Sequence, residues 1–403
     1  MIHIAGGIYR EYCMHPSWRE VYGSGGRAAS AIASIGGKVT LHGYTDPGIE
    51  AAIASRAALE GFQLASVAVK VGVDFSYHHP LATPLIRGVP ASTYPAIQVR
   101  EEKVIRFGII EGDAVVHADY AVYDPQNPKA PELFGANGST AKHLAVVLNF
   151  REAVLMTGTS GPTPLDVALA VASSSNAEVV VLKMGARGSL VYEGGSASIV
   201  PAYITERVWK IGSGDNFVAH FGYRWMTGHC SGHDAARQAS LATAYYCNHR
   251  AFAKPNALTQ FSPPEMRTSE RFSSGWKPNV YLAGPFFTLG QLWLIEQARN
   301  DLRDGVLDVF SPYHDVGHGS ADDVVEQDLA GIRNCDVLIA IGDGLDAGTI
   351  YEVGYARALG KPVVFYAENE SEEDRKMMVG SGCIMCDDYT TAIYKTLWAA
   401  AVL

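Results

Sequence analysis

The sequence predicts an α/β protein of two domains, each built around a mostly parallel sheet with helices on both faces. Two observations carry this prediction. Short apolar runs rich in β-branched residues, typical of buried strands, alternate along the chain with stretches of helical pattern. A chain of 403 residues is also long for one hydrophobic core. A polar, proline-rich segment at 263–278 is the expected linker, which gives domains at 1–262 and 279–403.

The first domain is expected to begin with a strand, a helix of small residues and a second strand. These elements are predicted from Ile2 to a turn at Gly6-Gly7, at 28–35 and at 39–41, with a closing turn at 43–46. Apolar and polar residues alternate in 70–112, which predicts short antiparallel strands. Further strands are expected at 115–123, 153–156 and 179–183, with a helix at 164–173.

A glycine-rich loop at 212–217, GSGDNF, carries the chemistry expected of the first domain. Consecutive backbone N–H groups at a helix start form a binding site for a phosphate group. Asp215 at that place could take the proton from an attacking hydroxyl. The alternative is that Asp215 only caps the next helix.

These segments resemble the PfkB/ribokinase family of sugar and nucleoside kinases. Residues 212–217 are similar to the family's Gly-Ala-Gly-Asp-x-Phe, and they come after 183–192, KMGARGSLVY, at the family's distance. Residues 149–152, NFRE, are similar to its Asn-x-x-Glu element, although a polar loop before a strand would read the same. The resemblance implies a ribokinase-like doubly wound sheet with a small antiparallel β lid, formed by residues 70–112, and ATP and Mg²⁺ as cofactors.

The same resemblance assigns roles to individual residues of the first domain. Glu11 would contact sugar hydroxyls, Asp215 would act as the base, and Glu152 would act indirectly on Mg²⁺. The residues that would bind the phosphates of ATP are Gly212, Ser213, Gly214 and Asn149. Where the family has Asp-Thr, this chain has Trp-Lys-Ile at 209–211. This departure leaves open a degenerate domain that binds a nucleoside as a sensor or scaffold and regulates the second domain.

The second domain is expected to restart the strand and helix alternation at Asn279. A helix is predicted at 289–302 and strands at 306–310 and 337–341. Another helix should begin near Thr349 and end at Gly360.

Three acidic residues come after the strand at 337–341, namely Asp343, Asp346 and Glu352. They are expected at the carboxyl end of the sheet, where open α/β folds bind ligands. A structural alternative exists for two of them. Thr349 and Glu352 have the spacing of a capping box, and Asp346 could be only a turn former.

Residues 346–356, DAGTIYEVGYA, resemble the motif of the nucleoside 2-deoxyribosyltransferase family. Three further matches precede it in the family's order, at 281–286, 311–312 and 328–332. The resemblance implies a smaller flavodoxin/Rossmann-like parallel domain that needs no cofactor. It also implies a homo-oligomer, because a neighbouring subunit completes the site in that family.

By this resemblance, Glu352 is the nucleophile that attacks the anomeric carbon of a nucleoside. Asp346 would hold the sugar hydroxyls and Asp328 would handle the proton on the leaving base. Tyr281 would line the base pocket, with Gly284 and Asp343 as further substrate-binding residues.

The outcome of the reaction and the form of the substrate stay open. A second base in the pocket would give base exchange, and water would give hydrolysis. The substrate could be a nucleoside or its 5′-monophosphate, in which case Ser311 or Ser320 could bind the phosphate.

Composition excludes some classes of function. The net charge of −10 argues against a nucleic-acid partner. No apolar run approaches the roughly 18 residues needed to span a membrane. The six cysteines are scattered, which favours a reducing cytoplasm, and neither Cys383-Ile-Met-Cys386 nor the loop at 228–233 is expected to bind a metal. A remaining alternative is that both domains only bind ligands.

Overall fold

A computed structural model of the chain describes residues 1–127, 129–159, 163–228 and 230–403. His229, in the loop expected to connect helices, lies outside the described residues. The chain forms two compact units, Met1–Glu265 and Met266–Leu403. The division falls inside the predicted linker at 263–278. Much of that segment packs into the second unit, because helix α8 (Glu270–Ser273) buries Phe272 and the backbone N–H of Ser269 donates to the carbonyl of Ala401.

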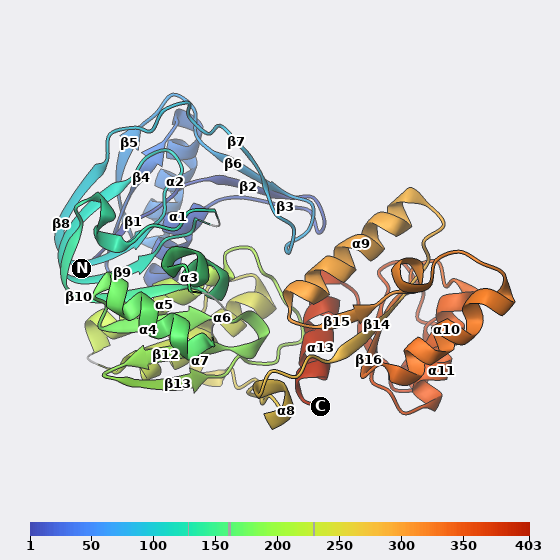
Figure 1. The fold of residues 1–403 in the computed structure, drawn as a ribbon. Helices are drawn as coiled ribbons and strands as arrows, with labels where there is room; N and C mark the ends of the chain where they lie inside the picture. The colour runs from blue at the N-terminus through green and yellow to red at the C-terminus, as the bar shows by residue number, and fades with distance from the viewer. Residues whose placement is uncertain (128, 160–162, 229) are drawn as a thin grey trace. The chain divides into compact units, whose positions relative to one another are not determined.

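The first unit is built on a large mixed sheet, drawn from blue to green in Figure 1. Within the described residues its order is β13-β12-β11-β10-β9-β8-β1-β4-β5. The strands are β1 (Ile2–Ala5), β4 (Val39–Thr45), β5 (Gln63–Ala68), β8 (Ile97–Phe107), β9 (Ala114–Asp124), β10 (Thr140–Asn149), β11 (Val179–Lys183), β12 (Ser189–Glu193) and β13 (Ser196–Val200). All pairs from β5 to β11 are parallel, while β12 and β13 pair antiparallel at one edge.

Helices cover both faces of this sheet. They are α1 (Gly23–Ser34), α2 (Pro47–Glu60), α3 (Phe150–Thr157), α4 (Pro164–Ser175), α5 (Ser213–Gly228), α6 (Gly232–His249) and α7 (Pro255–Gln260). Consecutive strand residues point to opposite faces, so Ile105 packs in the core under α1 and α5 while Val104 packs in the core under α3 and α4. The predicted doubly wound fold is confirmed.

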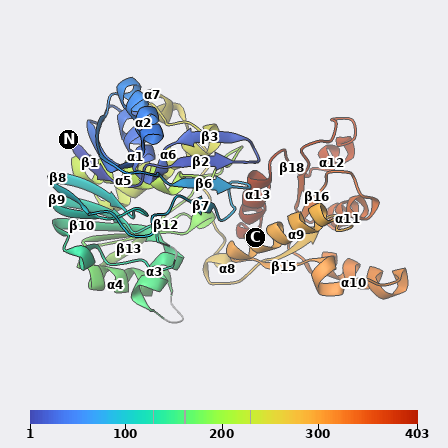
Figure 2. The same cartoon turned by 90° about the horizontal axis from the view of Figure 1, so that it is seen from above.

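A second, small sheet forms the lid, which is seen from above in Figure 2. Its order is β3-β2-β6-β7, from strands β2 (Arg10–Cys13), β3 (Trp18–Val21), β6 (Asp74–Tyr77) and β7 (Leu85–Arg87). The lid predicted within 70–112 was therefore placed partly wrong, because residues 97–107 form β8 of the main sheet. Their apolar side chains are buried in its two cores, and alternation alone does not distinguish a lid strand from a sheet strand.

Local predictions differ from the structure at three other places. The predicted strand at 153–156 is part of α3, because Asn149 and Glu152 form a capping box that starts a helix. Helix α1 begins at Gly23, five residues before the predicted start at 28, so the glycine-rich residues 23–26 lie inside the helix. The predicted turn at 43–46 is the end of β4 followed by Asp46, whose side chain caps α2.

The second unit is a five-stranded, all-parallel sheet in the described residues, with order β15-β14-β16-β17-β18. Its elements are β14 (Asn279–Ala283), α9 (Leu289–Asp304), β15 (Asp308–Phe310), α10 (Ala321–Asn334), β16 (Val337–Ile341), α11 (Ala347–Ala358), β17 (Val363–Tyr366), α12 (Lys376–Gly380), β18 (Ile384–Cys386) and α13 (Tyr389–Ala401). The predicted smaller parallel domain is confirmed, and β16 has the predicted bounds. Because the chain leaves β14 for one neighbour and returns to its other neighbour, the strand order reverses between β14 and β16, the place where such sheets bind ligands.

The described residues were searched for membrane-spanning helices, disulfide bonds and metal-binding clusters. No helix there combines the length and the apolar character that crossing a membrane requires. The six cysteines are unpaired. No cluster of three or more histidine, cysteine, aspartate or glutamate side chains in this part of the chain could hold a metal ion.

Two helical glycines of the second unit provide a test of its packing. A Cβ at Gly331 would lie 2.5 Å from the ring of Phe310, whereas a Cβ at Gly354 would meet nothing within 4 Å. We expect Gly331→Ala to destabilise the unit by about 1–3 kcal/mol, because a buried ring must move. Gly354→Ala, the matched control, should stabilise it by about 0.5–1 kcal/mol. Scanning calorimetry of the full chain checks both, and equal effects at the two positions would contradict the packing described.

Candidate active sites

The site of the second unit forms where the strand order reverses. Tyr281 lies on β14 with its side chain fully buried, and its ring stacks on that of Phe310 at 5.4 Å. Its hydroxyl donates to Oε1 of Glu352, on α11, at 2.6 Å. The other carboxylate oxygen, Oε2, makes no hydrogen bond to the described residues. Tyr281 therefore contributes its hydroxyl to the site rather than an exposed ring.

The surroundings of Glu352 favour its protonated form. Burial raises the pKa of Glu352 to about 7, the Tyr281 hydrogen bond opposes the rise, and the negative charges of Asp328 and Asp346 add to it. Burial and the adjacent carboxylate also raise the pKa of Tyr281, so its hydroxyl stays protonated and remains a donor. A carboxyl group with this pKa is partly ionised near neutral pH.

Two further carboxyl groups flank Glu352. Asp328, on α10, has a buried Oδ1 with no hydrogen-bond partner among the described residues, and burial raises the pKa of its carboxyl. Asp346 caps α11, since its Oδ2 accepts from the backbone N–H of Thr349 at 2.9 Å and from the Thr349 hydroxyl at 3.0 Å. The capping box predicted as an alternative for Thr349 and Glu352 is therefore wrong, and α11 begins at Ala347.

Asp343 and Gly284 shape the backbone around this site. The Oδ1 of Asp343 accepts from the backbone N–H groups of Glu368 and Asn369, at 3.0 and 2.9 Å, and so fixes the loop after β17. A Cβ at Gly284 would lie 2.8 Å from Ile295, which explains the glycine where β14 ends. The structure thus brings Tyr281, Asp328, Asp346 and Glu352 together. Asp343 instead binds the backbone of the loop at 368–369.

The two serines considered for phosphate binding already have partners. Ser320 donates its hydroxyl to Asp323 at 2.7 Å, within the cap of α10. Ser311 is 1% exposed, and its hydroxyl lies 3.1 Å from Nδ1 of His314.

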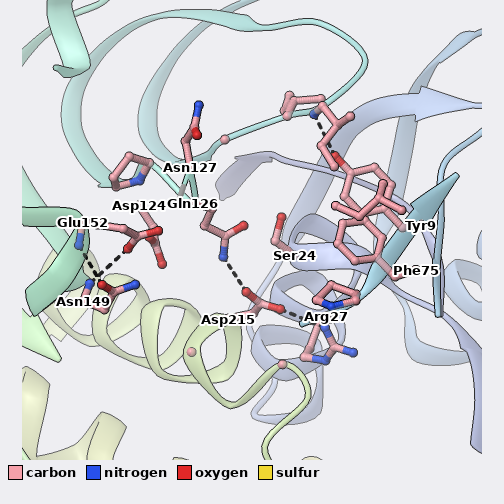
Figure 3. Close-up of a pocket in the computed structure, with 18 of the residues that line it drawn as sticks. Tyr9, Ser24, Arg27, Phe75, Asp124, Gln126, Asn127, Asn149, Glu152 and Asp215 are labelled. Atoms are coloured by element: carbon pink, nitrogen blue, oxygen red, sulfur yellow. Dashed lines mark hydrogen bonds and ion pairs between the residues drawn. The ribbon is translucent and has the colours of Figure 1, made fainter. Parts of the chain in front are cut away.

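The site of the first unit is a cavity of about 1060 Å³ between the lid and the carboxyl ends of the main strands. Asp215, in the first turn of α5, reaches into it (Figure 3). Its Oδ2 accepts from Nη1 of Arg27 at 2.8 Å, and its Oδ1 accepts from Nε2 of Gln126 at 2.6 Å. Each carboxylate oxygen of Asp215 therefore accepts one hydrogen bond.

Arg27 connects Asp215 to Glu11. The guanidinium, on α1, is 1% exposed and forms ion pairs with both carboxylates, while its Nε donates to the Tyr246 hydroxyl at 3.1 Å. Burial raises the pKa of Glu11, and the charge of Arg27 opposes that rise. Burial alone would lower the pKa of Arg27, but its carboxylate partners raise it well above its ordinary value.

The glycine-rich loop fits closely around these groups. Gly212 has φ of +75°, and a Cβ there would lie 1.9 Å from Nε of Arg27, so only glycine is accommodated. Gly214 lies beside Lys183, whose Nζ would be 3.6 Å from a Cβ at that position. Ser213 is buried and starts α5. A helix N-terminus next to a lysine ammonium group fits a phosphate.

The acidic residues at this edge are bound to the protein itself. Lys183 pairs with Asp124 at 2.7 Å, and burial raises the pKa of Asp124 to about 7, although Lys183 opposes it. Glu152 accepts from the backbone N–H of Asn149, and Asn149 accepts from that of Glu152. Asp124 is thus paired with Lys183 and Glu152 belongs to the capping box of α3, and these carboxyl groups do not form a direct Mg²⁺ site within the described residues.

Sequence reasoning missed Arg27, Gln126 and Lys183. Arg27 could have been found from the sequence, because it is the one charged residue in the run of small residues that begins at Gly25-Gly26. Gln126 and Lys183 sit at strand ends, and only the fold shows which strands are neighbours.

Two family models match different parts of the chain. Residues 121–255 match the model of the pfkB family carbohydrate kinases, and residues 280–384 match that of nucleoside 2-deoxyribosyltransferase. The chain is a fusion of these two domains. We refer to the first unit as the pfkB domain and to the second as the deoxyribosyltransferase domain. No curated protein matches the chain in sequence.

Solved structures resemble the pfkB domain in fold. A fructokinase from Vibrio cholerae O395, bound to fructose, ADP and calcium, aligns with a TM-score of 0.50 and 16% identity, over 64% of this chain and 98% of its own. Phosphofructokinase-2 from Escherichia coli in complex with potassium aligns with a TM-score of 0.49 and 14% identity, over 64% of this chain and 97% of its own. At such identity the likeness to the fructokinase concerns the fold alone, which is ribokinase-like.

Glu352 should make the stability of the deoxyribosyltransferase domain depend on pH. Its pKa rises from an ordinary 4.5 to about 7 on folding, so folding favours the protonated carboxyl. This stabilisation is complete below about pH 4.5 and is lost as the pH rises through about 7. Glu352→Gln, which stays neutral, should therefore be more stable than the parent at pH 8, by roughly 3 kcal/mol.

Calorimetric unfolding between pH 4 and pH 8 measures this effect. The difference between Glu352→Gln and the parent should vanish toward pH 4. Glu326→Gln, which removes an exposed carboxylate of α10, is the control and should change little at any pH. A Glu352→Gln effect that does not vary with pH would be inconsistent with the raised pKa.

Proposed function

We propose that the deoxyribosyltransferase domain breaks or exchanges the N-glycosidic bond of a nucleoside or deoxynucleoside, with Glu352 as the nucleophile. The observation that supports this most directly is the bond from the buried Tyr281 hydroxyl to Glu352. It fixes one carboxylate oxygen and leaves Oε2 without a partner among the described residues, at the ligand-binding point of the sheet.

The contacts suggest a role for each carboxyl group. Oε2 of Glu352 attacks C1′ of the sugar, the C1′–N bond breaks, and its electron pair leaves with the base. Asp328, whose pKa is raised by burial, supplies a proton to that base. Attack by a second base on the resulting ester gives exchange, while attack by water gives hydrolysis. Either step restores Glu352, and the proton of the incoming base or water returns to Asp328. Asp346, fixed by Thr349, binds the sugar hydroxyls.

The neighbouring serines bear on the form of the substrate. Ser320 already donates to Asp323, and α10 carries Asp322 and Asp323 in its first turn, which disfavours a phosphate there. Ser311 is almost fully buried. These contacts favour an uncharged nucleoside over its 5′-monophosphate.

For the pfkB domain, phosphoryl transfer and ligand binding alone are both compatible with its family. Phosphoryl transfer would use ATP, whose phosphates fit the start of α5 beside Lys183. The ion pair of Asp215 favours ligand binding alone. A general base must accept a proton from the substrate, and protonation of Asp215 would leave the buried Arg27 guanidinium with one fewer anionic partner. We infer that this domain binds a ligand and thereby regulates or supplies the deoxyribosyltransferase domain.

We also propose a cellular compartment and an oligomeric state for the protein. The unpaired cysteines suit a reducing cytoplasm. Leu289 and Trp293, one turn apart on α9, are 85% and 44% exposed, which supports a homo-oligomer formed through the deoxyribosyltransferase domain.

Replacement of the nucleophile tests the main proposal. Glu352→Ala should reduce base release from nucleosides by at least about 10³-fold, because no covalent intermediate can form. Free base is measured by chromatography after incubation with nucleosides and, separately, with 5′-monophosphates. Glu326→Ala is the matched control and should retain parental activity. Base release that survives in Glu352→Ala would rule out this nucleophile.

The Tyr281 hydroxyl should set the pH range of the reaction. Activity requires ionised Glu352, so kcat/KM should rise with pH through about 7. Because the Tyr281 hydrogen bond lowers the pKa of Glu352, Tyr281→Phe should move this rise to higher pH. The pH profiles of parent and variant measure the shift. An unmoved profile, or one displaced to lower pH, would refute the role given to this hydroxyl.

A further inference from the structure

The loop at 108–113, between β8 and β9, lies where the lid joins the main sheet of the pfkB domain. It contacts both the segment from β1 to β2 and the segment from β7 to β8, which connect the lid to that sheet. The backbone N–H of Ile110 donates to the Tyr9 hydroxyl at 3.0 Å. The carbonyl of Glu111 accepts from the backbone N–H of Tyr94 at 2.8 Å. Two connections to the lid are therefore anchored to adjacent residues of one loop.

Tyr9 extends this anchoring to the lid strands. Its ring stacks on that of Phe75, in β6, with centroids 5.1 Å apart and planes 24° apart. Figure 3 shows the two rings together at one side of the cavity, which both residues line. A Cβ at Gly7 would lie 2.1 Å from the Tyr9 ring, so the backbone leaves this ring little room to turn. A shift of the loop would therefore disturb a lid side chain at the cavity wall.

Tyr44, on β4, fixes the other side of the same loop. Its hydroxyl lies 2.7 Å from the carbonyl oxygen of Pro95 and 3.2 Å from that of Asp113. A Cβ at Gly112 would lie 2.5 Å from this hydroxyl, so the loop passes Tyr44 closely. A strand of the main sheet thus holds the loop together with the segment that returns from the lid.

Glu111 carries the one carboxyl group at this junction that has no cationic partner among the described residues. Its side chain is fully buried, and neither carboxyl oxygen makes a hydrogen bond of normal geometry there. An ionised carboxylate in such a place is unfavourable, because burial removes its hydration and no donor replaces it. Burial raises the pKa of Glu111 to about 7, and weak contacts from its own backbone N–H and from the Tyr9 hydroxyl oppose the rise. The protonated carboxyl is the form that fits the junction.

Other titratable and charged side chains surround this loop. They are Tyr9, Tyr44, Tyr94, Arg106 and Asp113. Burial raises the pKa values of Tyr9 and Tyr44, so both phenols stay protonated. Asp113 forms an ion pair with Arg106 of β8 at 2.8 Å. Among these groups Glu111 is the one whose pKa burial brings near neutral pH.

We propose that Glu111 is a pH-sensitive anchor that holds the lid of the pfkB domain against its main sheet. With Glu111 protonated, the loop at 108–113 keeps the connections through Tyr9 and Tyr94 in place. When Glu111 ionises, its carboxylate regains hydration only if the loop leaves its buried position, which releases both connections. The lid then opens more often, and ligand binding in the cavity weakens. This device acts whatever the ligand is and does not involve Glu352, so it is independent of the glycosidic reaction.

The pKa of Glu111 in the two states of the lid gives the direction of the effect. With the lid closed the pKa is about 7, whereas a carboxyl exposed by opening returns to its ordinary 4.5. The advantage of the closed state is therefore complete below about pH 4.5 and is lost as the pH rises through about 7. Between pH 6 and pH 8, the equilibrium constant for opening should rise roughly 10-fold.

Hydrogen exchange of the full chain without ligand tests this anchor. Exchange is followed by mass spectrometry at pH 6 and pH 8, on peptides that cover residues 7–11, 91–97 and 108–113. Labelling times are scaled for the faster chemical exchange at higher pH. After this correction, the peptides of the parent should exchange roughly 10-fold faster at pH 8 than at pH 6. Glu111→Gln, which stays neutral, should show the same corrected exchange at both pH values.

Glu111→Met is a second variant without a titratable carboxyl, for the case that an amide packs poorly at this buried position. It should also lose the pH dependence. Glu102→Gln, which removes a carboxylate of β8 whose side chain is 64% exposed, is the matched control and should behave as the parent. Corrected exchange of the parent that does not change with pH would overturn the proposal. So would a pH dependence that persists unchanged in the Glu111 variants.

Discussion

The site of the deoxyribosyltransferase domain depends on one hydrogen bond, from the Tyr281 hydroxyl to Glu352. Burial and two nearby carboxyl groups favour the protonated form of Glu352, which is a poor nucleophile. The phenol acts in the opposite direction, because it donates a hydrogen bond without adding a charge. One carboxylate oxygen is thereby oriented, and the other accepts no hydrogen bond from the described residues.

In the pfkB domain, the carboxylate of Asp215 has different hydrogen-bond partners from that of Glu352. Asp215 is held by a guanidinium and an amide, which engage both of its oxygens. A neutral donor orients a carboxylate without neutralising its charge, whereas the buried guanidinium of Arg27 compensates the charge of Asp215. The two carboxylates therefore have different electrostatic surroundings.

Much of the fold could be predicted from the sequence because buried parallel strands are short, apolar and β-branched. β11 and β16 are found at their predicted bounds for this reason. The strand predicted at 153–156 is a helix, because an apolar run of that length fits either element and the decisive capping contact lies in the preceding Asn149. The lid was predicted only in part. β6 and β7 lie in the predicted segment 70–112, whereas β2 and β3 do not, because β2 pairs with β6 from about 60 residues away in the chain.

The candidate sites could be predicted only in part. The motif residues of the second domain were named, but the Tyr281 contact to Glu352 joins segments on either side of the strand reversal and is not visible as a pattern. Arg27 illustrates the same limit. Its position in the small-residue helix is apparent in the sequence, yet its pairing with both Glu11 and Asp215 requires three elements to meet.

The central claim is that Glu352 bonds covalently to a sugar, and mass spectrometry of the digested protein tests it most directly. The protein is mixed with a nucleoside whose sugar carries fluorine at C2′, which slows breakdown of the ester, and is then acid-quenched and digested. We predict a mass increase equal to one glycosyl group on the peptide that contains residue 352. Release of base with that peptide unmodified, or with the added mass on another peptide, would contradict the account.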